Sequence, residues 1–171
     1  MRFPGVLLLL ATCLFADSIA GLKWMQPVGW KSLGRTSMRA ATYVLPAAAG
    51  DAEAAECVVY FFGAGQGGTI EANLQRWKGQ FTQADGKPAA GKVEKRTVHG
   101  LAVTTIESAG NYEAMSGPGM QAGGMKRNYR LLGAIVEGPG GNIFVKFTGP
   151  EKTVAAHLKK YEELLGSFQK E

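Results

Sequence analysis

The sequence predicts an α+β fold, in which a mostly antiparallel sheet is covered by two main helices. Two observations carry this prediction. Apolar residues recur at helical spacing in two segments, and the chain between and around these segments contains β-branched and apolar runs that alternate with turn residues. The resulting order is strand, strand, helix, hairpin, loop, hairpin, helix, which is typical of an α+β domain with its helices laid against the sheet.

The chain begins with the three parts of a secretory signal peptide. Arg2 precedes an apolar run over Val6–Phe15, and the small residues Ser18 and Ala20 follow that run. The apolar run is too short to cross a bilayer of about 30 Å. We therefore predict a signal peptide over residues 1–20 that is cleaved after Ala20, and no transmembrane helix after cleavage.

Cys13 offers a second interpretation of the same segment. The run Leu10-Ala11-Thr12-Cys13 is similar to a lipidation motif, in which Cys13 would become the acylated first residue of a lipoprotein. Thr12 is larger than the residue that such motifs carry before the cysteine, and the apolar stretch continues past Cys13. We therefore favour an exported periplasmic or extracellular protein over a lipoprotein.

The remaining residues, 21–171, are predicted to form a single domain. Cleavage removes one basic residue, Arg2, and one acidic residue, Asp17, so the formal net charge stays at +5. The positive charge favours an anionic ligand or an envelope protein as the partner, and an exported protein is not expected to bind nucleic acid. Cys57 is the only cysteine left, which excludes an intramolecular disulfide.

Two strands and one helix are predicted in the first half of this domain. Met38–Leu45 is predicted to form a strand that ends at Pro46. The uninterrupted apolar run Cys57–Phe62 predicts a central strand that is buried on both faces. From Ile70 to Phe81, apolar residues fall at i, i+4, i+7 and i+11, which predicts a helix with one apolar face.

A hairpin and a long loop follow. The two runs Lys92–Val98 and Leu101–Glu107 are separated by the two residues His99-Gly100, which predicts a tight turn between paired strands. Residues Gly110–Lys126 show no periodicity and are rich in glycine and methionine. We expect them to form a mobile loop.

A second hairpin and a helix complete the chain. Tyr129–Glu137 and Asn142–Thr148 flank the turn residues Gly138-Pro139-Gly140-Gly141. Pro150 suits the first turn of a helix, because its missing N–H would have no partner there. One apolar face of this helix is predicted to contain five residues, Val154, Leu158, Tyr161, Leu165 and Phe168.

Three features together resemble the Mog1/PsbP-like family of α-β-α sandwiches. They are the P-x-G-W pattern Pro27-Val28-Gly29-Trp30, the order of strands and helices, and the closing run Leu164-Leu165-Gly166-Ser167-Phe168. The resemblance covers most of residues 22–168. Gly149–Val154 and Tyr60–Gly68 also look like segments of uncharacterised exported bacterial proteins. The resemblance implies a binding or accessory role and supplies no catalytic residues.

The glycine-rich segment before the first helix is the first candidate site. Gly63-x-Gly65-x-x-Gly68 follows a strand and precedes a helix, as a dinucleotide fingerprint does. The hairpins that follow, and the position of Asp85 in a loop, argue against such a site. Two interpretations of the segment remain: it holds an anion near the start of the helix, or it forms a flexible turn. The candidate ligand-binding residues are Gly63, Gly65, Gly67, Gly68 and Thr69.

The second candidate site is the methionine-rich loop. Met115, Met120 and Met125 recur at five-residue spacing, and their thioethers would suit Cu(I) in an oxidising compartment. The alternative is that they fold over the sheet as adaptable apolar caps. His99 and His157 are not spaced as a metal pair, so we predict no zinc site and no cofactor.

No residue pattern indicates catalysis. The sequence contains no G-x-S-x-G elbow for a serine nucleophile. Glu53, Glu56, Glu107 and Glu137 leave open a hydrolase built from paired carboxylates. The leading hypothesis is an exported, non-enzymatic accessory or binding domain of the cell envelope, with a periplasmic small-ligand or Cu(I) binder as the first alternative and an unrecognised hydrolase as the second.

Overall fold

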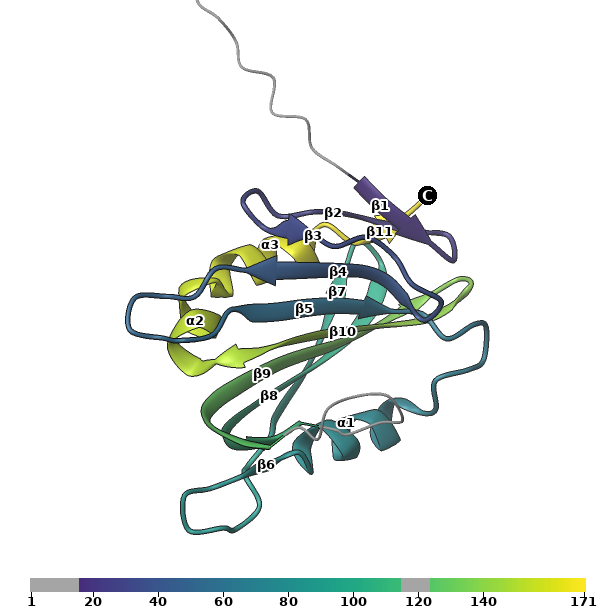
Figure 1. The fold of residues 1–171 in the computed structure, drawn as a ribbon. Coiled ribbons are helices and arrows are strands. Elements are labelled where there is room, and N and C mark those ends of the chain that lie inside the picture. Colours follow the sequence, from purple (N-terminus) through teal and green to yellow (C-terminus); the bar gives the residue numbers. More distant parts are fainter. Residues whose placement is uncertain (1–15, 115–123) are drawn as a thin grey trace, which may run out of the picture.

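The computed structural model describes residues 16–114 and 124–171, which form two antiparallel sheets and three helices (Figure 1). The larger sheet has the order β3-β4-β5-β10-β9-β8-β6, and β7 pairs with β8 beside β6. Its strands are β3 (Lys31–Ser32), β4 (Arg39–Leu45), β5 (Ala55–Tyr60), β6 (Phe81–Thr82), β7 (Lys92–Val98), β8 (Leu101–Glu113), β9 (Met125–Gly138) and β10 (Gly141–Pro150).

The smaller sheet contains three strands in the order β1-β2-β11. They are β1 (Ala16–Ile19), β2 (Leu22–Met25) and β11 (Gln169–Lys170). Residues 16–19, which lie inside the predicted signal peptide, thus pair with β2. Residues 1–15, including Cys13, lie outside the described residues. In the part of the chain that is described, no helix is long and apolar enough to span a membrane.

The larger sheet separates two apolar cores. One face packs against the smaller sheet and the C-terminal helices, α2 (Glu151–Ala156) and α3 (Leu158–Gly166). The other face packs against α1 (Ile70–Lys78), the one helix of the described residues on that side (Figure 1). Because side chains alternate between the faces of a strand, Val145 and Phe147 enter the first core while Phe144 enters the second.

Several predicted elements are confirmed. Cys57, Val58 and Val59 are buried in β5, which pairs with β4 on one side and β10 on the other. Strands β7 and β8 form a hairpin through His99 and Gly100, which both have positive φ, at 46° and 77°. This backbone matches the right-handed twist of paired strands. Strands β9 and β10 form the second predicted hairpin.

The predicted helix over residues 70–81 is shorter than its apolar spacing suggests. It ends at Lys78, and Gly79 caps it with its N–H donated to the carbonyl of Gln75. Phe81 instead lies in β6, where it pairs with Tyr112 of β8. The side chain of Phe81 is 1% exposed and reaches the same core as α1. Its apolar spacing therefore indicated that Phe81 is buried, but not that it lies in the helix.

The C-terminal helix predicted after Pro150 begins at Glu151, as expected, but it is divided at His157. That residue has φ −103° and ψ 6°, and it ends α2 and precedes α3. Four of the five residues predicted for its apolar face are buried, namely Val154, Tyr161, Leu165 and Phe168, and Leu164 is buried beside them. Leu158 is 37% exposed. Phe168 lies beyond α3, where its ring stacks on that of Trp24 at 5.1 Å. The prediction that two main helices cover the sheet is confirmed only in part, because the smaller sheet also packs on the face that α2 and α3 cover.

Strands occupy part of the predicted loop over residues 110–126. β8 continues to Glu113 and β9 begins at Met125, and these two residues pair with each other. A register shift at Gly110, where φ is +143°, allows β8 to continue past its expected end. Met115 and Met120 lie outside the described residues.

Candidate functional site

A cavity of about 220 Å³ lies between α1 and the larger sheet, and we call it the α1 pocket. Four aromatic and two cationic side chains line it, from β5 and the segment after it, from α1 and from β10. They are Tyr60, Phe62, Arg76, Trp77, Phe144 and Lys146. Ligand pockets are mostly apolar with a few polar groups that fix orientation, and this cavity has that composition.

Strand geometry places three of these side chains on one wall. Phe144 and Lys146 are two residues apart in β10, so both face α1. Tyr60 pairs directly with Phe144 across β5 and β10. The ring of Tyr60 also stacks on that of Phe62 at 5.8 Å and 9°, which extends the aromatic wall beyond the end of β5.

Lys146 carries the charge at the bottom of this wall. Its Nζ donates hydrogen bonds to Oε1 of Gln80 at 2.8 Å and to the hydroxyl of Tyr112 at 3.1 Å. Burial and, to a smaller extent, the positive charge of Arg76 lower the pKa of Lys146 to about 8, against the opposite effect of Glu56. The ammonium is thus partly desolvated and close to a second cation.

Arg76 is held at the opposite wall by its own helix. Its Nη2 donates to Oδ1 of Asn73, one turn earlier in α1. Neither Arg76 nor Lys146 forms an ion pair with a carboxylate within residues 16–114 and 124–171. Two cations that share one cavity without a carboxylate create a positive potential, which favours an anion.

The glycine-rich segment packs against this pocket. A Cβ on Gly67 would lie 2.7 Å from Cε2 of Phe144 and 2.8 Å from Cδ2 of Phe62, so only glycine fits there. Asn73 fixes the segment, because its Nδ2 donates to the carbonyls of Gly67 and Thr69, each at 2.8 Å. The segment therefore supports the pocket wall.

The remaining predicted glycine-loop residues have other surroundings. The hydroxyl of Thr69 caps α1 by accepting from the N–H of Ala72 at 3.1 Å. Gly63 and Gly68 have positive φ, as does Gly65, which has no neighbour within 4 Å of its Cβ position. Because β5 is antiparallel to both of its neighbours, the loop does not form the βαβ unit of a dinucleotide site.

Met125 is the one predicted methionine ligand that the structure describes. It is 64% exposed at the start of β9 and borders an open hollow with Arg127 and Asn128. No group of three His, Cys, Asp or Glu side chains suited to a metal occurs among the described residues.

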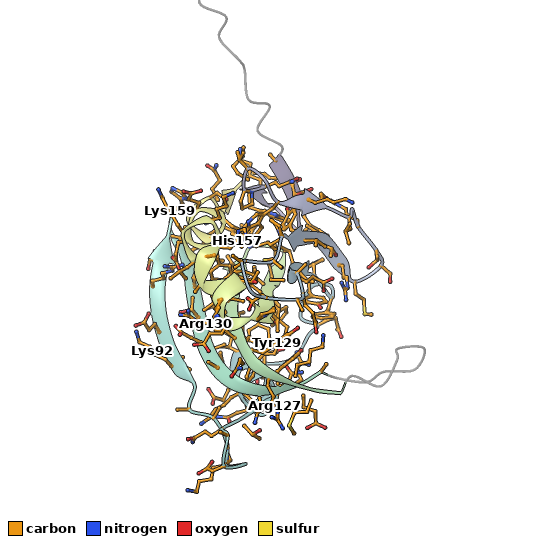
Figure 2. The ribbon with its side chains drawn as sticks, turned by 60° about the vertical axis from the view of Figure 1, so that its left-hand side comes forward. Lys92, Arg127, Tyr129, Arg130, His157 and Lys159 are labelled. Carbon is orange, nitrogen blue, oxygen red and sulfur yellow. The ribbon has the colours of Figure 1, made fainter. Side chains whose placement is uncertain are left out.

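Three of the four carboxylates considered for hydrolysis, Glu53, Glu56 and Glu107, each bind a cation of their own. Glu56 pairs with Arg39 at 3.2 Å, and Glu107 pairs with Arg130 at 2.7 Å. Glu53 contacts Lys126, and the hydrogen bond from the Lys126 ammonium keeps the pKa of Glu53 below its usual value. Figure 2 shows Arg130 and Tyr129 on the same strand, β9.

Glu53 also accepts a hydrogen bond from the hydroxyl of Tyr129 at 2.6 Å.

Cys57, the free thiol of the domain, is fully buried, and burial raises its pKa. A reactive cysteine is exposed and has a lowered pKa, so Cys57 is a core residue.

Sequence reasoning did not find Lys146 or Arg76. One local signal was present, because Lys146 is the single charge in the run Ile143-Phe144-Val145-Lys146-Phe147. A charge within a buried strand requires compensation or a function. Arg76 gave no such signal, since it lies on the polar face of its helix.

Comparisons with known proteins agree with this fold. No protein-family model matches the sequence, and no curated protein matches it significantly. A Pseudomonas aeruginosa protein of unknown function superimposes with a TM-score of 0.50 at 14% identity, over 90% of this chain and 94% of that one. CyanoP, the PsbP protein of the cyanobacterium Synechocystis, gives a TM-score of 0.51 at 14% identity, over 92% and 91%. At this identity the likeness concerns the fold alone, and the chain has a PsbP-like fold, as the resemblance implied.

Proposed function

We propose that the chain is an exported, non-enzymatic binding domain of the cell envelope that holds a small anionic ligand in the α1 pocket. One observation carries this proposal. Arg76 and Lys146 share an aromatic cavity, and neither has a carboxylate partner in the described part of the chain. A bound anion would compensate both charges.

The size and lining of the cavity favour a small ligand with an apolar body. Pockets for drug-sized ligands enclose about 300–1,000 Å³, so a cavity of about 220 Å³ suits one ring or a short chain. Tyr60 and Phe62 offer flat surfaces to such a body. An aromatic or branched carboxylate combines the two required features.

The α1 pocket is a better-supported ligand site than the two alternatives. The Cu(I) alternative depends on Met115 and Met120, which lie outside the described residues. The hydrolytic alternative needs carboxylates that converge, whereas Glu56 and Glu107 each pair with an arginine of their own. Export is supported by the predicted signal peptide over residues 1–20.

A thermal-shift series with benzoate, phenylacetate and short branched carboxylates tests the proposal. A ligand at 100 times its Kd stabilises the folded state by about 2.7 kcal/mol, which corresponds to a rise in Tm of about 5–10 °C for a domain of this size. Uncharged analogues such as benzamide should give no comparable rise.

Two variants on the same helix provide the control. Arg76→Gln removes a pocket charge and should reduce the rise in Tm. Lys78→Gln removes a charge from the same last turn of α1 but outside the pocket lining, so it should leave the rise unchanged. Equal effects of the two variants, or no rise with any carboxylate, would contradict the proposal.

A further inference from the structure

Lys146 has the surroundings of a reactive amine. Lys146 lines the α1 pocket together with four aromatic side chains, and its Nζ is hydrogen-bonded to the neutral groups of Gln80 and Tyr112 rather than to a carboxylate. Arg76 adds a second positive charge to the same cavity. Desolvation and a neighbouring cation are the two conditions that convert a lysine into a nucleophile.

We propose that Lys146 binds its ligand covalently, by forming a reversible imine with a small aldehyde or ketone that also carries a carboxylate. This proposal rests on the ligand-binding function proposed above and names the class of ligand. The carbonyl carbon meets Nζ of Lys146, the carboxylate pairs with Arg76, and the apolar body of the ligand lies against Tyr60 and Phe62.

The lowered pKa of Lys146 makes its neutral amine available near neutral pH. With a pKa of about 8, about one molecule in ten carries the neutral amine at pH 7. An ordinary lysine, with a pKa of about 10.4, is neutral in about one molecule in 2,500 at the same pH. At pH 7 the fraction of Lys146 in the neutral, reactive form is therefore about 200-fold larger than that of a surface lysine.

The reaction is balanced without an oxidant or reductant. The nitrogen lone pair attacks the carbonyl carbon and forms a C–N bond, while the carbonyl oxygen takes up one of the nitrogen protons. The resulting hydroxyl then leaves with the second nitrogen proton as water, and a C=N bond forms. The reverse reaction, with one water consumed, releases the ligand.

Tyr112 is placed to assist these proton transfers. Its hydroxyl lies 3.1 Å from Nζ, and burial raises its pKa to about 12, so the hydroxyl stays protonated throughout the pH range in which the amine becomes neutral. A group at hydrogen-bond distance that can both accept and donate a proton is suited to general acid–base assistance.

Borohydride trapping tests the proposal with 4-carboxybenzaldehyde as the probe. The full chain is incubated with the probe and sodium cyanoborohydride, a hydride donor that reduces an imine to a stable secondary amine and leaves the free aldehyde largely unreduced. Intact-mass and peptide analysis should show one main adduct, on Lys146. Labelling should be at least tenfold faster than at Lys159, an exposed lysine of α3 that serves as the internal control (Figure 2).

Two variants keep the outcome interpretable. Lys146→Arg retains the charge and should abolish the main adduct. Arg76→Gln leaves the amine in place and should slow trapping of 4-carboxybenzaldehyde several-fold more than trapping of benzaldehyde, which has no carboxylate and loses only the effect of the Arg76 charge on the pKa of Lys146. The labelling rate at Lys146 should rise with pH up to about pH 8 and level off above it.

Separate results identify which proposal fails. Adducts spread evenly over surface lysines, together with a rise in Tm with benzoate, would overturn the imine and leave the anion-binding pocket intact. Even labelling without any response to benzoate would overturn both. A main adduct that persists in Lys146→Arg would place the reactive amine elsewhere and would also refute the imine at Lys146.

Discussion

The hydroxyl of Tyr112 in β8 lies 3.1 Å from Nζ of Lys146 in β10, two strands away in the larger sheet. The ring of Tyr112 also lies beneath the ammonium, 5.3 Å from Nζ to the ring centroid, and stacks on Tyr129 at 5.7 Å. A cation on an aromatic face is partly compensated by the ring. This contact keeps a charge in the pocket wall without a carboxylate.

The cost of burying Lys146 predicts a pH-dependent difference in stability. Its pKa is about 10.5 in the unfolded chain and about 8 in the folded protein, so the unfolded state binds more protons between these values. Stability then rises with pH in this window. In Lys146→Met this contribution is absent.

The difference in the free energy of unfolding between the native chain and Lys146→Met should therefore change by about 2–3 kcal/mol between pH 7 and pH 10.5, in favour of the native chain. Urea unfolding at both pH values measures it. The tyrosines that titrate above pH 10 act equally on both proteins and cancel in the comparison. A constant difference would mean that Lys146 titrates as an exposed lysine.

Gly67 should tolerate no side chain. In Gly67→Ala the new methyl group would meet the rings of Phe144 and Phe62 below 3 Å, at a φ of +90° that alanine rarely adopts. We expect a loss of about 2–4 kcal/mol in the free energy of unfolding, together with weaker ligand binding.

Gly65→Ala is the matched control for this change. Gly65 has a similar φ of +69°, but nothing lies within 4 Å of its Cβ position. Only the backbone cost of about 1 kcal/mol should remain. If both variants lose the same amount, the contact of Gly67 with the pocket wall has no energetic role.

Asp51 should stabilise α2 from a distant loop. Its carboxylate accepts from the N–H of Thr153 at 2.9 Å and from the Thr153 hydroxyl at 2.6 Å, while the N-cap residue Pro150 provides no side-chain hydrogen bond. Asp51→Ala should lower the free energy of unfolding by about 1–2 kcal/mol in urea titrations. Asp51→Asn retains an acceptor and should lose less; equal losses would show that the capping bond is not the cause.

The position of signal cleavage should affect stability. Tyr43 donates to the carboxylate of Asp17 in β1 and accepts from Nε1 of Trp24 at 2.9 Å. Cleavage after Ala20, as predicted, removes Asp17. A chain that starts at Gly21 should then melt several degrees below one that starts at Ala16, and intact mass of the exported protein identifies which form occurs. Equal Tm values would show that β1 adds no stability.

Local signals predicted the parts of the fold that depend on neighbours in sequence. The turn residues between Lys92–Val98 and Leu101–Glu107 specify a hairpin by themselves, and the run Cys57–Phe62 specifies a buried strand. Phe81 was misplaced because apolar spacing records burial and not the element that provides it, whereas Leu158 lies in a helix as predicted but is 37% exposed. A helix end at Gly79 and a division at His157 leave no mark in that spacing.

The α1 pocket was not predictable in the same way. Arg76 and Lys146 are far apart in the sequence, and only the pairing of β10 with β5 and the packing of α1 bring them to one cavity. The glycine segment was identified correctly as a loop between strand and helix. Its contact with Phe144, which gives Gly67 its importance, comes from tertiary packing.

The arrangement of the two ends of the described chain has a practical consequence. Strands β1 and β11 flank β2 in the smaller sheet, on the face of the larger sheet opposite α1 (Figure 1). An affinity tag or surface linker at either end is therefore attached on the far side of the domain from the α1 pocket. Immobilisation by these ends leaves the pocket exposed to the analyte, so sensor-chip measurements can compare ligands without blocking the site.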